Sequence, residues 1–212
     1  MNDRSARKAA TRVAILDTAA SLFADRGFIA VTTAGIAEAA GISHGLIFAH
    51  FPTRDDLIAA VTARFGLLMG SRLHDLAEAQ ESLRAVLQAH LRTIGEHELL
   101  YTRFIAELGL LPAAAQEHFV AMQSVVSHHL FRAAAGEMQS GIIMPIENDL
   151  LFNTWAGLLH YYLTNRRLFT TGSSVIASLG ERLLTHFLSL IAQKEDHHGR
   201  SVHRLRNAYG KG

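Results

Sequence analysis

The side chains most able to do chemistry at neutral pH are thirteen histidines, in a chain of 212 residues that contains no cysteine. An imidazole can bind a transition metal or transfer a proton. The absence of cysteine excludes disulfides, thiolate metal sites and cysteine nucleophiles, which fits a reducing cytoplasm. Adjacent residues of a helix point about 100° apart, so adjacent histidines chelate poorly, and no two of the candidates have the helical spacing i, i+4. The histidines considered as metal ligands are His90, His97, His118, His128, His129, His160, His197 and His198.

No enzyme motif accompanies these histidines. The sequence has no GxSxG nucleophile elbow, no HExxH zinc motif and no glycine-rich phosphate loop. An enzyme that uses histidine as acid and base is therefore disfavoured, and we expect no cofactor and no metal. Metal regulation through the histidines is kept as an alternative, which titration with zinc or nickel tests.

The stretch Thr32–Arg54, TTAGIAEAAGISHGLIFAHFPTR, has the spacing of two short helices that cross closely. Gly41 can take the left-handed conformation that ends the first helix, and Ala37 is small enough to admit the second. Ser43 can cap the second helix, and Pro52 cannot continue it. The outer face of this second helix is then available for a DNA major groove.

A preceding helix, predicted from Thr11 to Arg26, must support this pair. It is expected to stop at Gly27, with Phe28 folding back on its last turn. Its buried stripe is predicted from apolar residues at helical spacing, which are Val13, Leu16, Ala19, Ala20 and Phe23.

The first ten residues carry Arg4, Arg7 and Lys8 and have no apolar face. We expect a mobile arm at residues 1–10. Two uses stay open for it, since a basic terminus can be a solvated tail or can contact phosphates or a minor groove.

The remainder of the chain is predicted to be helical. Only three prolines and a hydrophobic content of 49% favour an all-α fold with a sizeable core. Thr53 followed by Asp56 has the form of a capping box at the start of a long helix. No run approaches the roughly 20 apolar residues of a membrane-spanning helix. The predicted helices cover residues 54–76, 81–97, 99–110, 113–139, 147–165 and 174–193.

The last two helical patterns, 147–165 and 174–193, have apolar stripes too wide for one small core. We therefore expect these two helices to pack against a second copy of the chain in a homodimer. After Ala192 the sequence turns polar and basic, and residues 194–212 are expected to form a tail without fixed structure.

About fifty residues, roughly 11–61, are similar to the N-terminal domain of the TetR family of bacterial transcriptional regulators. The shared pattern includes Leu-Phe-x-x-x-Gly-Phe at the end of the first helix, Ile-Ala-x-x-Ala-Gly-Ile-Ser at the turn, and His-Phe-Pro after the second short helix. The resemblance implies a cytoplasmic homodimer whose two helix-turn-helix units read the half-sites of a palindromic operator. The implied domains are an arm and DNA-binding domain at 1–53, with the helix-turn-helix at about 33–51, and a helical effector-binding and dimerisation domain at 54–193.

Three positions of the second short helix depart from the family pattern. His44 stands where the family often has lysine, Leu46 replaces a frequent small polar residue, and Phe48 replaces a tyrosine whose hydroxyl bonds a phosphate. The helix therefore carries no lysine or arginine, and affinity must depend on Arg54, the basic arm and helix N-termini. The DNA-facing residues that the resemblance implies are Thr33, Ser43, His44, Gly45, Leu46, Phe48, His50 and Arg54.

The resemblance also implies a small-molecule pocket in the helical domain, with His118, Tyr101 and Glu107 as candidate polar anchors. We expect a ligand-responsive repressor released by a small, largely apolar effector. The alternative is a dimeric helical binding module or scaffold with weak or lost DNA binding. The candidate pocket walls are Phe65, Met69, Tyr101, Phe104, Phe119, Met122, Trp155 and Tyr161.

Overall fold

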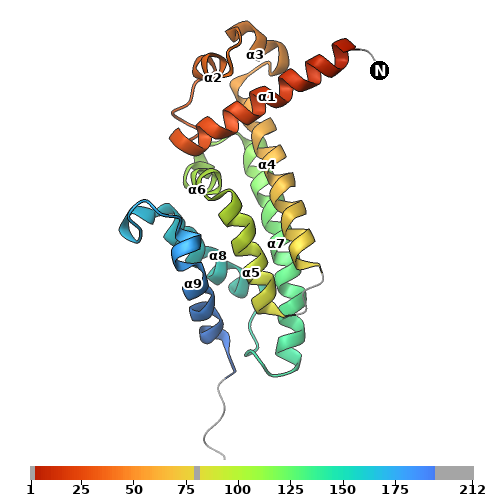
Figure 1. Ribbon diagram of the computed structural model, residues 1–212. Helices are drawn as coiled ribbons and strands as arrows, with labels where there is room; N and C mark the ends of the chain where they lie inside the picture. Colours follow the sequence, from red (N-terminus) through yellow and green to blue (C-terminus); the bar gives the residue numbers. More distant parts are fainter. Residues whose placement is uncertain (1–2, 79–81, 194–212) are drawn as a thin grey trace, which may run out of the picture.

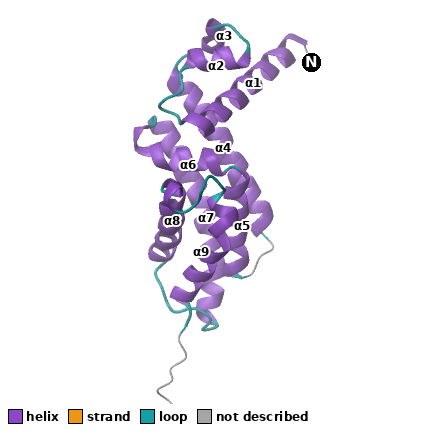
Figure 2. Ribbon diagram, turned by 60° about the vertical axis from the view of Figure 1, so that its left-hand side comes forward, coloured by secondary structure: helices purple, strands orange, loops and turns teal. Residues whose placement is uncertain are grey.

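A computed structural model describes residues 3–78 and 82–193, and within these ranges it contains helices and no strand (Figure 2). The prediction of an all-α fold is confirmed. Three helices form one end of the molecule, which we call the head: α1 (Asp3–Arg26), α2 (Thr33–Ala40) and α3 (His44–His50). The remaining helices form what we call the body: α4 (Arg54–Ala77), α5 (Leu83–Glu96), α6 (Glu98–Glu107), α7 (Ala113–Gln139), α8 (Asn148–Thr164) and α9 (Val175–Ile191).

Helix α1 is longer than predicted. It begins at Asp3, so most of the segment expected to be a mobile arm is helical, and that expectation was wrong. Val13 was also misplaced in the buried stripe, because its side chain is 47% exposed while Ile15 is buried. At the other end, α1 stops before Gly27, which has a φ of 89°. Phe28 is buried in the core. Both features were predicted from the sequence.

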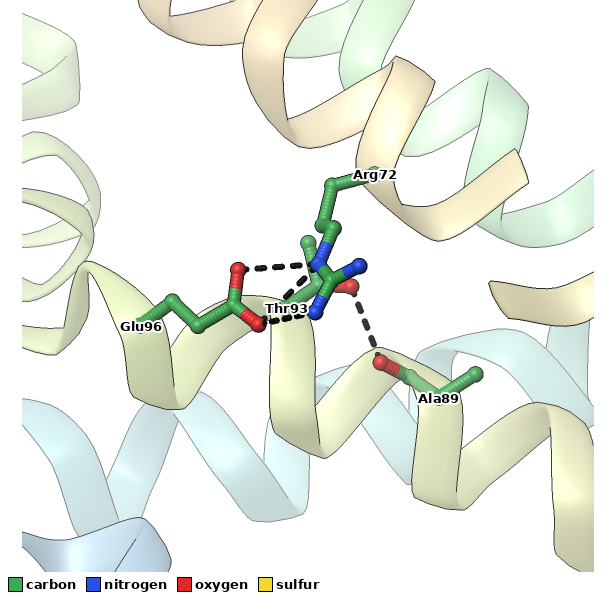
Figure 3. Close-up of polar contacts among 4 residues, drawn as sticks. All are labelled: Arg72, Ala89, Thr93 and Glu96. Carbon is green, nitrogen blue, oxygen red and sulfur yellow. Dashed lines mark hydrogen bonds and ion pairs between the residues drawn. The ribbon is translucent and has the colours of Figure 1, made fainter. Parts of the chain in front are cut away.

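Helix α4 connects the head to the far end of the body and lies alongside α7 (Figure 1). Its start is fixed by the predicted capping box, in which Thr53 accepts from the Asp56 backbone N–H and the Asp56 side chain accepts from the Thr53 backbone. Further along, Arg72 reaches across to α5 and donates three hydrogen bonds of 2.6 to 3.0 Å to the Glu96 carboxylate (Figure 3). These bonds lower the pKa of Glu96. Such a bidentate, charge-assisted pair fixes the geometry between the two helices.

Head and body share one apolar core. Phe28 of the head lies against Phe104 of α6, with ring centroids 5.7 Å apart. Phe104 in turn contacts Phe65 of α4 and Phe119 of α7, at centroid distances of 6.3 and 5.4 Å. Because these rings belong to one continuous cluster, the position of the head is tied to the packing of the body.

The body helices lie close to their predicted positions. The segment predicted at 99–110 ends as an α-helix at Glu107 and continues as a 3₁₀ turn, Leu108–Leu110. A second 3₁₀ turn, Arg166–Leu168, follows α8. The predicted tail, 194–212, lies outside the described residues. No helix in the described part of the chain has the length and apolar character to span a membrane.

Candidate nucleic-acid interface

The turn between α2 and α3 is fixed by local backbone bonds. Thr32 caps α2 by accepting from the Gly35 N–H at 3.1 Å. At the other end of α2, Gly41 takes the predicted left-handed conformation with a φ of 65°. Ile36 and Ile47 are buried where the two helices cross. This crossing turns the opposite side of α3 away from the core at the end of the molecule (Figure 1).

The two sides of α3 differ in exposure. Ile47 is fully buried, whereas Phe48 on the other side is 42% exposed. Ser43 occupies the predicted N-cap position, but its side chain makes no capping hydrogen bond. The exposed residues of this segment are Ser43, His44, Gly45, Phe48 and Ala49, and the half-buried ones are Leu46 and His50.

His44 is held in place by two neighbours. Its Nε2 lies 2.9 Å from the Thr33 hydroxyl at the start of α2, and its ring meets the Phe48 ring edge-on with centroids 5.0 Å apart. Thr33, His44 and Phe48, all predicted to face DNA, therefore form one contiguous patch. The sequence gave no signal for the Thr33–His44 bond, because it joins residues on different helices.

Arg12 is a residue of this region that the sequence analysis did not single out. Its Nη1 donates to the His50 carbonyl at 2.8 Å, and its guanidinium lies 4.1 Å from the centre of the Phe51 ring. Both contacts lie at the C-terminal end of α3, where backbone carbonyls lack helical partners. Arg12 therefore anchors α3 to α1 and places a cation at the C-terminal end of α3.

Arg54 has a structural role that the sequence did not indicate. Its Nη2 donates to the carbonyls of Phe28 and Val31, the second at 3.3 Å, and the side chain is half-buried. A cation in the first turn of a helix is unfavourable to the helix dipole, and these carbonyls account for its presence without a phosphate. DNA contact by Arg54 stays a prediction.

The other basic residues of the head lie on α1. Arg4 and Lys8 are exposed on its N-terminal part, and both views place this part at the same end of the molecule as α3 (Figures 1 and 2). The exposed lysine and arginine side chains at this end of the molecule therefore lie on α1 and not on α3.

The predicted effector pocket is almost closed. Met69, Tyr101 and Met122 line a cavity of about 10 Å³ between α4, α5, α6 and α7, which is enough for about one water molecule. Tyr161, also predicted as a wall, does not line this cavity and is 56% exposed on α8. The other predicted wall residues are buried in the common core: Phe65, Met69, Tyr101, Phe104, Phe119, Met122 and Trp155.

One buried and one partly buried hydrogen bond border this closed interior. The Tyr101 hydroxyl lies 2.9 Å from His160 Nε2, and the Trp155 Nε1–H donates to His90 Nδ1 at 3.0 Å. Burial lowers the pKa of His90 to about 3, with a smaller contribution from the charge of His160, and lowers the pKa of His160 to about 4. Both imidazoles are therefore neutral at pH 7 and serve as hydrogen-bonding core residues.

The other two proposed polar anchors are occupied by protein groups. The His118 Nδ1 lies 3.0 Å from the Thr62 hydroxyl. The Glu107 carboxylate accepts from the Ile29 backbone N–H at 2.8 Å and so joins α6 to the head. Tyr101 alone among the three candidate anchors lines the cavity.

Comparisons with known proteins identify the head by sequence and the whole arrangement of helices by structure. Residues 15–61 match the family of bacterial regulatory proteins described as the tetR family. The chain is 41% identical over 81 residues to the HTH-type transcriptional repressor Rv3405c of Mycobacterium tuberculosis, covering 38% of this chain and 43% of that protein. It is 32% identical over 91 residues to the HTH-type transcriptional repressor KstR2 of Rhodococcus jostii, covering 43% of this chain and 45% of that protein. The match therefore spans less than half the length of these curated relatives.

The described fold extends the likeness beyond the head. The crystal structure of reduced NemR from E. coli superposes with a TM-score of 0.70 over 88% of this chain and 99% of that chain, at 17% sequence identity. At this identity the likeness concerns the arrangement of helices and not the residues that line the interior.

Proposed function

From an N-terminal domain that belongs to the tetR family of bacterial regulatory proteins, we propose that the chain is a DNA-binding transcriptional repressor acting in the cytoplasm. The observation that carries the proposal is the patch formed by exposed His44 and Phe48 on α3, whose opposite side is buried, together with half-buried Thr33 at the start of α2. Such a helix can enter a major groove without unfolding any part of the core.

The patch reads DNA by apolar and neutral polar contacts. Leu46 and Phe48 can contact thymine methyl groups, and Ser43 and His44 can form hydrogen bonds with bases or phosphates. The positive charge comes from Arg12, which bonds the C-terminal end of α3, and from the N-terminal part of α1, which lies at the same end of the molecule as α3. Ser43, Gly45, Leu46 and His50 complete the predicted contact set with this patch.

Dimerisation through α8 and α9 would supply the second reading helix. Leu150 and Tyr161 on α8 and Leu190 on α9 are large apolar side chains that stay exposed in the single chain. Burial of such side chains against a second copy is favourable. A palindromic operator then fits two α3 helices spaced about one DNA turn, roughly 34 Å, apart.

The effector is proposed to be small and largely apolar, because the interior between α4 and α7 is lined by apolar and aromatic side chains around Tyr101. The cavity is too small for any effector as it stands, so binding must separate the body helices. Since the body shares its core with the head, an effector that favours an expanded body opposes DNA binding by thermodynamic linkage.

Fluorescence anisotropy with DNA fragments flanking the gene tests the proposal. We expect nanomolar binding to one fragment, and at least a tenfold loss for the double variant His44→Ala/Phe48→Ala. The matched control is Leu110→Ala, an exposed apolar residue of the body, which should bind like the unmodified protein. Failure to bind every upstream fragment at low salt would refute the repressor.

The same assay separates the second candidate, a dimeric helical module with weak or lost DNA binding. That candidate is favoured by an α3 with no lysine or arginine and by Phe48 in place of a phosphate-bonding tyrosine. It predicts weak binding that is equal for all fragments and unaffected by the double substitution.

A further inference from the structure

Three ionisable side chains meet where α4 ends beside α7. His74 and Glu78 lie one helical turn apart, at spacing i, i+4 on α4 and its C-cap, and His129 faces them from α7. One nitrogen of each imidazole and one carboxylate oxygen all lie within 4.8 Å of one another. His74 Nδ1 is 3.4 Å from His129 Nε2 and 3.4 Å from Glu78 Oε2.

These separations suit metal ligands better than hydrogen bonds. A contact of 3.4 Å is beyond the usual 2.7 to 3.2 Å of a hydrogen bond to nitrogen. With metal–ligand bonds of about 2.0 to 2.1 Å, two ligands of a tetrahedral zinc lie about 3.4 Å apart, whereas neighbouring octahedral ligands lie about 2.9 Å apart. We propose that His74, Glu78 and His129 form a site for a divalent transition metal that accepts tetrahedral coordination, with Zn²⁺ as the preferred ion.

The ring of His129 is buried, with 1% of the residue exposed. Its Nε2 lies 3.4 Å from His74 Nδ1, which is longer than a usual hydrogen bond to nitrogen. A metal ion bound at Nε2 would give the side of this buried ring that faces His74 and Glu78 a strong polar interaction.

Glu78 is held by a group outside the three ligands. Arg132 donates from Nη2 to the Glu78 backbone carbonyl at 3.0 Å, and its Nη1 lies 3.9 Å from Glu78 Oε1. The other carboxylate oxygen, Oε2, is the one that faces His74. Arg132 therefore acts as a positioning residue for the carboxylate, in the manner of outer-shell groups at metal sites.

The site is open to solvent on one side, because His74 and Glu78 are exposed while His129 is buried behind them. Water can therefore enter and provide a fourth ligand, as in zinc sites with three protein ligands. A bound ion would join the C-terminal end of α4 to α7, about 30 Å along α4 from the head. The sequence analysis missed this set because it compared histidines only with each other and did not include His74.

Isothermal titration of the metal-free full-length protein with Zn²⁺, without an affinity tag, tests the proposal. We expect one strongly bound ion per chain. His74→Ala and Glu78→Gln should each weaken binding at least tenfold, and both positions are exposed, so the fold is expected to be retained, as circular dichroism can verify. The matched control is His186→Ala, an exposed histidine of α9, which should bind Zn²⁺ like the unmodified protein.

Cobalt substitution tests the geometry separately, because tetrahedral Co²⁺ absorbs visible light far more strongly than octahedral Co²⁺. A strong visible band that is lost in His74→Ala would support the site. Zinc binding that is undiminished in His74→Ala and Glu78→Gln, or an absence of binding at micromolar Zn²⁺, would overturn it. Neither readout involves DNA, so the site can fail or succeed independently of the proposed repressor function.

Discussion

Histidines contact aromatic rings in two different settings: on the outer face of α3 and in the interior of the body. In the head, His44 contacts Phe48 at the surface, where both groups can meet a ligand directly. In the body, His160 bonds Tyr101 and His90 bonds Trp155 around a cavity of about 10 Å³. The first arrangement is ready to bind, whereas the second must open before it can hold an effector.

The two regions also differ in how far apart in the sequence their hydrogen-bonded residues lie. Caps in the head join residues three apart, as in the bond from the Gly35 N–H to Thr32. The bond between Trp155 and His90 joins residues 65 apart, on α8 and α5. The head is therefore specified mainly by local patterns, and the interior of the body by long-range packing that fixes which helices meet.

Phe104→Ala should have the largest effect, because this ring is shared by the two regions. It is fully buried between Phe28 of the head and Phe119 of α7. Removal of a buried phenylalanine ring lowers the free energy of unfolding by about 3–5 kcal/mol. Urea denaturation followed by circular dichroism measures the loss, and head and body should unfold in one transition.

The control for this experiment is Leu110→Ala, which removes an apolar side chain that is 73% exposed. Its effect should stay within about 0.5 kcal/mol. A loss of less than about 1 kcal/mol in Phe104→Ala, or two separate transitions, would show that head and body do not share a tightly packed core.

Acid should destabilise the body through its buried histidines. The pKa values of His90 and His160 are lowered to about 3 and about 4 in the folded protein, whereas in the unfolded chain both are near 6.5. Below about pH 6.5 the two histidines become protonated in the unfolded chain but stay neutral in the folded protein. The free energy of unfolding then falls by about 1.4 kcal/mol per pH unit for each histidine, until the folded pKa is reached.

The variant His160→Gln isolates this contribution, since glutamine can still accept a hydrogen bond from Tyr101 but does not titrate. Urea midpoints measured between pH 7.5 and 5 should give a slope smaller by about 1.4 kcal/mol per pH unit below pH 6.5. An unchanged slope would mean that His160 titrates in the folded protein as it does in the unfolded chain.

Gly41→Ala tests whether a left-handed residue ends α2. Gly41 has a φ of 65°, and an added Cβ would meet no atom within 4 Å, so the cost is backbone strain alone. We expect a loss of about 1–3 kcal/mol. The matched control is Gly136→Ala in α7, where an added Cβ also has open space, and where alanine should stabilise the helix by about 0.5–1 kcal/mol. Equal effects of the two substitutions would contradict the left-handed turn.

Helix caps formed by residues close in the sequence were predicted, whereas side-chain contacts between residues far apart in the sequence were missed. The cap at Gly41 and the capping box at Thr53 follow from short patterns, and both are present. The bonds of Arg12 to α3 and of Arg54 to the turn after α1 span 38 and 26 residues. No periodicity encodes such contacts, so these two arginines could not be assigned before the helices were placed.

Arg54→Gln separates a structural role from a DNA contact. The carbonyls of Phe28 and Val31 lose their donor, and the free energy of unfolding should fall by about 1–2 kcal/mol. Arg64→Gln, on the same helix, breaks only an exposed pair with Asp17 and should cost about 0–1 kcal/mol. The predicted phosphate contact of Arg54 requires, in addition, that the salt slope of DNA binding fall by about 1 in Arg54→Gln. An unchanged slope with reduced stability would leave Arg54 with the structural role alone.

Phe48→Tyr should have the smallest effect and acts only on the exposed face of the head. The added hydroxyl can donate to a DNA phosphate, which is worth about 0.5–1.5 kcal/mol, or up to about a tenfold increase in affinity. Because phosphates carry no sequence information, binding should tighten equally on operator and random DNA. An uncharged hydroxyl releases no counterion, so the salt slope should not change.

The same substitution made away from this face is the control. Phe169→Tyr alters a half-buried ring of the body that contacts Tyr162, and it should leave DNA affinity unchanged. If Phe48→Tyr weakens binding to the operator alone, the Phe48 ring contacts bases, and the added hydroxyl has displaced an apolar contact such as one to a thymine methyl group. That outcome would place Phe48 among the residues that specify sequence, in contrast to the tyrosine that usually stands at this position in the family.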